Sequence, residues 1–212
     1  MKTWKQGIFG VLVLFALTLT ACDGDDDDGG GGFTQKYSIG DTGPGGGKIF
    51  YVSTEGFTVF MVNPAQNYTA HYLEAAPEDM PTTLAWASSA YLTPPHGTGS
   101  DIFIKDTEVE IGKGRKNTDI ILAIDAEAPA ALACKNLTTG GKTDWFLPSD
   151  LEQARLYMNR AAVGNFAEDW YWSSSEREYL GAFSRSFVEG GSTDPVSKLK
   201  SDKYSVRAVR AF

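Results

Sequence analysis

The chain has few of the residues that carry catalysis and metal binding: its 212 residues include only two histidines and two cysteines. His71 and His96 stand apart in loop-like surroundings, and no Ser-His-Asp arrangement or metal-ligand cluster can be assembled around them. Acidic residues are abundant, but nothing singles out a pair for glycoside hydrolysis. We therefore expect no enzymatic activity and no cofactor. A structural calcium ion stays open, because scattered oxygen ligands leave no linear signature.

The N-terminal apolar run is too short to cross a bilayer as a helix. It covers residues 8–19, follows two lysines and precedes the sequence LTAC at 19–22. A small residue before a cysteine, with leucine three positions upstream of it, resembles the bacterial lipobox. This pattern predicts a lipoprotein signal peptide over 1–21 and lipid attachment at Cys22. The alternative is an ordinary signal peptide followed by an unrelated cysteine.

A disulfide within the chain is excluded if Cys22 carries lipid, because only Cys134 then remains. Cys134 lies in a helix-like run, and no neighbouring cation or helix N-terminus would activate its thiol. We expect a buried, small apolar side chain at this position. An exported domain without a disulfide must be stable through its core alone.

Basic residues are scarce: 19 lysines and arginines stand against 27 acidic residues, which gives a net charge of −8. Removal of residues 1–21 takes Lys2 and Lys5 with it and lowers the charge to −10. This sign opposes nucleic acid, whose phosphates require neutralisation, and it opposes anionic lipid headgroups. The expected partners are the membrane, through the lipid anchor, and an extracellular ligand.

Residues 23–32 read DGDDDDGGGG. Like charges repel and glycine adds backbone freedom, so we expect a flexible tether that covers 22–36 with the lipidated cysteine. Acidic residues directly after a lipidated cysteine resemble the signals that bring lipoproteins to the outer surface of some bacteria. The expected location is the cell envelope, lipid-anchored, on the exposed face of the outer membrane. The periplasmic face is the alternative.

The remainder, 37–212, is long enough for one globular domain. Aromatic and β-branched residues predict strands over 48–53, 57–63, 72–75, 170–174, 182–188 and 204–211. Glu55-Gly56 predicts a hairpin between the first two strands.

Helices are expected over 82–89, after an Asn117 cap, from Pro129 to a glycine pair at 140–141, and after Ser149. Ser149 and Glu152 have the spacing of a capping box. The apolar stripe predicted to face the core in that last helix is Leu151, Ala154, Met158 and Ala161. Strands at both ends with helices between them indicate an α+β domain.

Four motifs occur in order: GDTGPGGGKIFYV at 40–52, DWFLPS at 144–149, YWSSSE at 171–176 and YSVRAVRAF at 204–212. Together they resemble the C-terminal domain family of the Legionella collagen-like adhesin, over roughly 37–212. The resemblance implies a C-type-lectin-like fold, related to that of formylglycine-generating enzymes. In such a fold, helices pack on a twisted antiparallel sheet, the chain ends lie close together, and long loops carry binding. The family adhesin is a homotrimer that binds sulfated glycosaminoglycans.

The chain departs from that adhesin family in two ways, and it lacks signatures of the more distant relatives. The tether replaces the collagen-like stalk, and the domain is acidic where a polyanion-binding surface is basic. The paired cysteines of the formylglycine-generating relatives and the calcium-dependent sugar-binding tripeptides of C-type lectins are absent. Apart from 113–116, the dense basic stretch that would have to gather on one face is Lys198, Lys200, Lys203, Arg207 and Arg210.

These observations predict a non-enzymatic, adhesin-like surface lipoprotein that binds an extracellular glycan or protein through loops beside the C-terminal sheet. The alternative is a structural or assembly component of the cell envelope that acts through self-association or another lipoprotein. Aromatic rings stack on sugars, and hydroxyl and charged groups bind polar ligands. The candidate ligand-binding residues are Trp170, Trp172, Ser174, Glu176, Arg177, Tyr179, Arg185, Asp194, Lys198 and Lys200. The competing interpretation places the tryptophans in the core and Arg207 and Arg210 in structural salt bridges.

Overall fold

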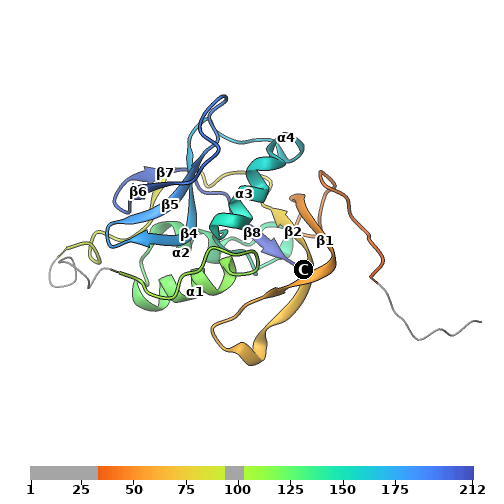
Figure 1. The fold of residues 1–212 in the computed structure, drawn as a ribbon, viewed down its shortest axis with the longest axis horizontal. Coiled ribbons are helices and arrows are strands. Elements are labelled where there is room, and N and C mark those ends of the chain that lie inside the picture. Colours follow the sequence, from red (N-terminus) through yellow and green to blue (C-terminus); the bar gives the residue numbers. More distant parts are fainter. Residues whose placement is uncertain (1–32, 94–102) are drawn as a thin grey trace, which may run out of the picture. The chain divides into compact units, whose positions relative to one another are not determined.

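The computed structural model describes residues 33–93 and 103–212. In this part of the chain, four α-helices and eight strands form an α+β domain with antiparallel sheets, as the order of the predicted elements indicates (Figure 1). Cys22, the tether up to residue 32 and the loop residues 94–102 with His96 lie outside the described residues.

The strands are β1 (Lys48–Val59), β2 (Tyr68–Ala75), β3 (Leu84–Ala85), β4 (Trp170–Glu178), β5 (Gly181–Ser186), β6 (Val196–Leu199), β7 (Lys203–Tyr204) and β8 (Val209–Ala211). The helices are α1 (Gly114–Ile124), α2 (Pro129–Asn136), α3 (Asp150–Met158) and α4 (Arg160–Val163), with short 3-10 helices at Pro64–Gln66 and Thr139–Gly141. The sheets have the strand orders β1-β2-β8, β3-β7 and β4-β5-β6. α3 lies between the two three-stranded sheets and contacts β1 on one side and β4 and β5 on the other (Figure 1).

The first sheet shows that the hairpin predicted at Glu55-Gly56 is wrong. β1 continues through this point as one strand, with Val52 opposite Tyr72 and Phe57 opposite Ala70 of β2. The intervening residues form an irregularity in the strand, where Gly56 adopts a φ of +78°. A glycine with positive φ serves a bulge as well as a hairpin turn, so the local sequence did not distinguish the two.

The predicted helix over 82–89 is also wrong. Leu84–Ala85 forms the short strand β3, which pairs with Lys203–Tyr204 of β7. The following residue, Trp86, is 1% exposed, and its indole N–H donates to the Ser173 carbonyl at 2.8 Å. Burial of this large ring against a distant strand outweighs the local helix preference. The strand predicted over 204–211 is likewise divided between β7 and β8.

The central helices follow the predictions in part. α2 begins at Pro129 as predicted, although it ends at Asn136, before the glycine pair. α1 begins at Gly114, so Asn117 is inside the helix and is not its cap. The buried Asn117 side chain instead accepts from the Glu108 N–H at 2.9 Å and donates to the Glu108 carbonyl. It holds the preceding loop against α1.

α3 has the predicted capping box but turns a different face to the core. Ser149 Oγ accepts from the Glu152 N–H at 3.3 Å, and Glu152 Oε2 accepts from the Ser149 N–H at 2.8 Å. Leu156 is 1% exposed, whereas Leu151 and Met158 of the predicted core stripe are 43% and 67% exposed. The apolar stripe therefore faces outward.

Two clusters of buried side chains form the hydrophobic core. One contains Trp145 and Trp172, and the other contains Phe146 and Phe50. Cys134 is fully buried in the first cluster, as predicted, and burial raises the pKa of its thiol.

The first described residues pack close to the C-terminus. The Phe33 ring stacks on His71 with a centroid distance of 3.8 Å, and the Tyr37 ring lies 5.8 Å from that of Phe212. Phe212 in turn accepts backbone N–H groups of β2 through its carbonyl. The two ends of the described domain are therefore neighbours, as the resemblance implies.

Candidate functional site

Half of the ten predicted ligand-binding residues lie inside the domain: Trp172, Ser174, Glu176, Arg185 and Lys200 are less than 8% exposed. The Trp172 indole N–H donates to the Leu84 carbonyl at 2.8 Å and fastens β3 to β4. Ser174 Oγ accepts from Asn117 Nδ2 at 3.2 Å. Trp172 and Ser174 therefore connect buried elements. For Trp172 this agrees with the competing interpretation, which places the tryptophans in the core.

Glu176 and Lys200 form an ion pair whose side chains are 1% and 0% exposed. Glu176 Oε1 accepts from Lys200 Nζ and from the Ile104 N–H, and Lys200 Nζ also donates to the Tyr179 carbonyl at 2.7 Å. Burial raises the pKa of Glu176 to about 7, although Lys200 opposes this change. Burial also lowers the pKa of Lys200. The pair fastens β4 to the residue that follows β6.

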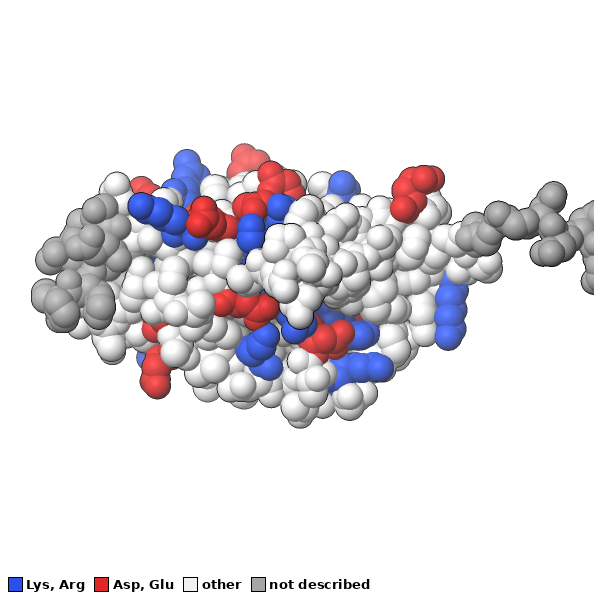
Figure 2. Space-filling model, turned by 90° about the horizontal axis from the view of Figure 1, so that it is seen from below, with Lys and Arg blue, Asp and Glu red and all other residues white. Residues whose placement is uncertain are grey.

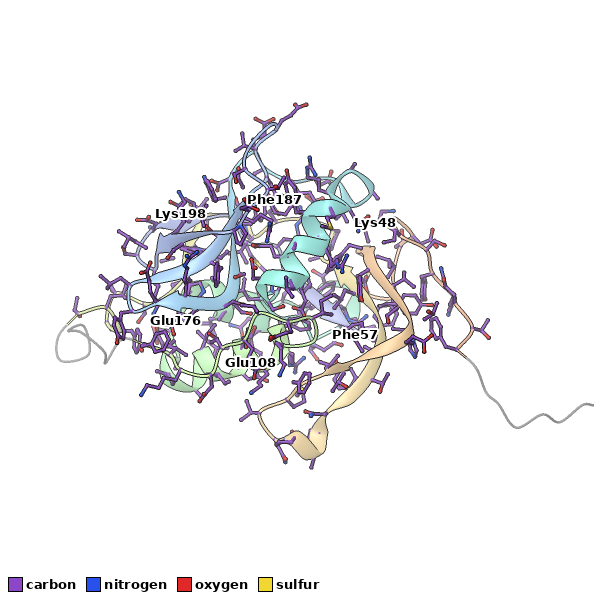
Figure 3. All side chains as sticks on the ribbon, viewed as in Figure 1. Lys48, Phe57, Glu108, Glu176, Phe187 and Lys198 are labelled. Atoms are coloured by element: carbon purple, nitrogen blue, oxygen red, sulfur yellow. The ribbon has the colours of Figure 1, made fainter. Side chains whose placement is uncertain are left out.

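The two loops expected to form one binding surface lie at opposite ends of β5. Arg177 near the end of β4 and Tyr179 in the turn after it precede this strand, and the loop with Asp194 follows it. Figure 3 shows Glu176 and Phe187 at these two ends. Because six residues of strand extend about 20 Å, Arg177 and Tyr179 do not share a surface with Asp194.

Trp170 and Lys198 do come together. Both side chains are partly exposed, and Lys198 Nζ lies 4.1 Å from the centroid of the Trp170 ring. The ammonium group therefore covers one face of the indole in a cation–π contact. This contact joins β4 to β6 across the intervening β5.

Three of the five residues in the basic stretch near the C-terminus form internal salt bridges: Lys200, Arg207 and Arg210. Arg207 Nε donates to Asp79 Oδ1 at 2.6 Å, and Arg210 donates to Glu74 at 3.0 Å and to Asp144 at 2.9 Å. Both arginines are at most 5% exposed, so the structural interpretation of these residues is confirmed. On the face drawn in Figure 2, acidic and basic side chains are interspersed. The arginines that a sulfated polymer would need are therefore engaged inside the domain.

A groove of about 560 Å³ lies beside α3 and is the candidate site. Residues of α3 and the segment 193–195 line it, and two of the predicted ligand-binding residues, Arg185 and Asp194, take part. A concave site of this size, largely apolar with a few polar groups, is typical of a ligand-binding pocket.

Arg185 joins the three elements around the groove. Its Nη2 donates to Asp150 Oδ1 at 3.2 Å, and its Nη1 donates to the Thr193 carbonyl. Its Nε is buried without a hydrogen-bond partner in the described part of the chain. Burial raises the pKa of Asp150, an effect that the Arg185 charge opposes. This pair holds the loop segment against the first turn of α3 and thereby shapes the groove.

The apolar side of the groove comes from the outward face of α3. Leu151, Ala154 and Met158 line it, together with Tyr157 and Pro195. Exposed apolar side chains gathered beside a hollow are typical of interaction surfaces. Sequence reasoning missed this site because it assigned the same stripe to the core. The helical spacing marked an apolar face on this helix but carried no signal of what covers that face.

Neither a metal-ligand cluster nor a membrane-spanning helix occurs in residues 33–93 and 103–212. No group of three or more histidine, cysteine or acidic side chains is placed there to hold a metal ion. None of the helices in these ranges is long and apolar enough to cross a membrane.

Comparison with known proteins gives no family. No family model matches the chain, and no curated protein matches it. Among solved structures, a fimbrial protein from Bacteroides ovatus is similar with a TM-score of 0.48 and 16% sequence identity. The similarity covers 78% of this chain and 44% of the fimbrial protein, so the chain spans less than half the length of that protein. No family model therefore supports the resemblance to the Legionella adhesin family.

Proposed function

We propose that this protein is a lipid-anchored, non-enzymatic cell-surface protein that binds an extracellular ligand in the groove beside α3. The groove carries the proposal, because Leu151 and Met158 expose 43% and 67% of their surface on its wall. Covering such side chains removes apolar area from water and favours association. Thr193 and Asp194, exposed on the loop side that Arg185 holds in place, add polar groups for orientation of the ligand.

The proposed location rests on the sequence. The LTAC motif at 19–22 supports lipid attachment at Cys22, and the acidic tether after it supports display on the outer membrane. The four motifs that resemble the Legionella adhesin family support a C-type-lectin-like domain with an adhesin-like role and a homotrimeric state. Several anchored copies would bind a multivalent partner with avidity.

The test compares groove variants on a defined array. Three full-length proteins are applied to the same surface: the wild type, Met158→Ser and the control Val62→Ser. Val62 is 58% exposed and does not line the groove. The array carries glycans, sulfated polymers and extracellular-matrix proteins at physiological salt. We expect saturable binding by wild type and control, and a loss of about tenfold in Met158→Ser, because a covered thioether side chain is lost. Equal binding by all three proteins would contradict the assignment of the groove as the binding site.

A second candidate function is self-association in the envelope, and a separate surface favours it. Tyr179, Leu180 and Leu199 are 50%, 52% and 54% exposed around the turn between β4 and β5. Light scattering of the full-length protein distinguishes the two functions. A stable oligomer that Leu180→Ser dissociates, together with an array that binds nothing, would favour envelope assembly.

A further inference from the structure

We infer that the ligand of the groove is a polypeptide segment that places an apolar side chain against α3 and a basic side chain beside Asp194. The inference rests on the proposed function and narrows its ligand from glycan or protein to protein. Three features of the described residues carry it: the covered aromatic rings, the apolar wall and the sign of the accessible charge.

Three of the four tryptophans in the described part are buried, and the fourth has a cation over one face of its ring. Trp86, Trp145 and Trp172 are at most 1% exposed, and the Lys198 ammonium covers Trp170 at 4.1 Å. Carbohydrate sites commonly use an open aromatic face as their platform. These four rings are engaged by the domain itself.

The aromatic ring within the groove is also covered. Tyr157 is 8% exposed. The Arg160 guanidinium lies 4.1 Å from its centroid, and the Phe187 ring meets it edge-on at 5.2 Å. A sugar ring against the α3 wall would therefore meet the aliphatic side chains of Leu151, Ala154 and Met158, which offer it neither hydrogen bonds nor a π-face.

An apolar side chain of a polypeptide suits the wall better. Leu151 and Met158 stand on one face of α3, and Ala154 lies between them in sequence on the same face. Methionine is unbranched and polarizable, so it adapts to apolar partners of different shape. Helical faces with this spacing commonly receive apolar anchors of a partner chain.

The accessible charge on the loop side of the groove is negative. Arg185 already bonds Asp150 and is only 6% exposed, so its charge is compensated inside the domain. Asp194 is exposed, and the connection 187–195 between β5 and β6 contains Glu189 and Asp194 but no lysine or arginine. Arg155, on the other flank of α3, lies over the Tyr51 ring at 5.6 Å. A basic side chain beside the anchor is complementary to this loop, and a sulfated polymer is not.

The experiment is a selection with random dodecapeptides displayed on phage against the immobilised full-length protein. Peptides that bind wild type and not Met158→Ser are sequenced, and the affinities of the best are measured by fluorescence anisotropy. We expect an apolar residue next to lysine or arginine to be enriched in them. Asp194→Asn should weaken such a peptide about two- to fivefold, and replacement of its basic residue by glutamine should abolish that difference. The matched control Glu55→Gln, an exposed acid in β1, should bind like wild type.

The other outcomes separate this inference from the proposed function. Enrichment of acidic or uncharged peptides would overturn the inference. Glycan binding that depends on Met158, while peptide binding does not, would also overturn it. In both cases the groove would remain the proposed binding site. If Met158→Ser leaves the binding of every ligand class unchanged, both the inference and the proposed groove function are overturned.

Discussion

The Glu74 carboxylate and the Arg210 guanidinium meet inside the domain, with Glu74 Oε2 3.0 Å from Arg210 Nη1 and Glu74 fully buried. Glu74 Oε1 also accepts the N–H groups of Gly45 at 2.9 Å and Gly47 at 2.8 Å, and Arg210 donates to Asp144. One charged network thus joins the glycine-rich motif, DWFLPS and the C-terminal motif. Three of the four motifs on which the resemblance rests therefore have a structural role here.

Replacement of Glu74 by glutamine should destabilise the domain strongly. The change leaves a buried guanidinium without its buried counter-ion, and breaking such a pair costs about 3–5 kcal/mol of unfolding free energy. Urea denaturation of the full-length protein measures this loss. The matched variant Asp144→Asn touches the same arginine but has a side chain 35% exposed, so it should cost less than about 1 kcal/mol. Equal losses would show that burial of the pair is not what matters.

Adjacent glycines of the same motif should tolerate alanine very differently. A Cβ on Gly47 would lie 1.8 Å from the Ala75 carbonyl oxygen, a backbone atom of the paired strand. A Cβ on Gly46 would meet nothing within 4 Å, although its φ of +79° strains any other residue. We expect Gly47→Ala to cost more than about 3 kcal/mol and Gly46→Ala about 1–2 kcal/mol in the same denaturation experiment. The reverse order would contradict the packing described for β1 and β2.

Stability should fall as the pH rises towards neutrality because of Glu152. This fully buried carboxylate accepts N–H groups of Gly112 and Ser149, both at 2.8 Å, but burial raises its pKa from 4.5 to about 7. A pKa raised by folding stabilises the folded state below the unfolded pKa, and this contribution is lost as the pH rises through about 4.5 to 7.

The measurement is the urea midpoint and unfolding free energy at several pH values between 5 and 8. In Glu152→Gln, the decline with pH should be smaller by up to about 1.4 kcal/mol per pH unit. Glu176, whose pKa is also raised to about 7, supplies the part of the decline that remains. Glu55→Gln, at an exposed position, should keep the wild-type slope. An unchanged slope in Glu152→Gln would show that this carboxylate is ionised in the folded protein throughout the range.

The buried pair of Glu176 and Lys200 should show strong coupling in a double-mutant cycle. Lys200→Met leaves the Glu176 carboxylate buried without its cation and should cost about 3–5 kcal/mol. The double variant Glu176→Gln, Lys200→Met removes both charges, and its loss should be smaller than the sum of the single losses by about 1–3 kcal/mol. Additive losses would mean that the two side chains do not form a pair in solution.

Lipid attachment is tested independently of the fold. We expect cells supplied with labelled palmitate to incorporate it into the wild type and into Cys134→Ala, and not into Cys22→Ala. The Cys22→Ala protein should also leave the membrane fraction. Label retained by Cys22→Ala would contradict the lipobox interpretation of LTAC at 19–22.

Local chemistry explains which predictions agree with the structure. Ser149 and Glu152 are three residues apart and satisfy each other's backbone groups, so the start of α3 was readable from the chain. Pro129 fits the first turn of α2 because it needs no N–H partner there. The hairpin prediction at Gly56 was wrong because it rested on local sequence alone. A glycine with positive φ suits both a hairpin turn and the bulge that the structure has there.

The groove could not be read in this way. The stripe of Leu151, Ala154 and Met158 has the spacing of a core face, but the other side of α3 faces the interior with Glu152 and Leu156. Spacing shows that one face of a helix is apolar, and it does not show what covers that face. Placement of α3 between two sheets settles the matter, and it leaves the stripe on the surface.

The chain on its own was enough to establish the α+β class, the Ser149 cap of α3 and the start of α2 at Pro129, because these depend on composition and on residues a few positions apart. Which tryptophans are covered, which charges are accessible and where a hollow forms depended on folding in three dimensions. Glu74 and Arg210 are 136 positions apart, and Leu84 and Trp172 are 88 apart. Burial and ion pairing are relations between such distant segments, so no local pattern encodes them.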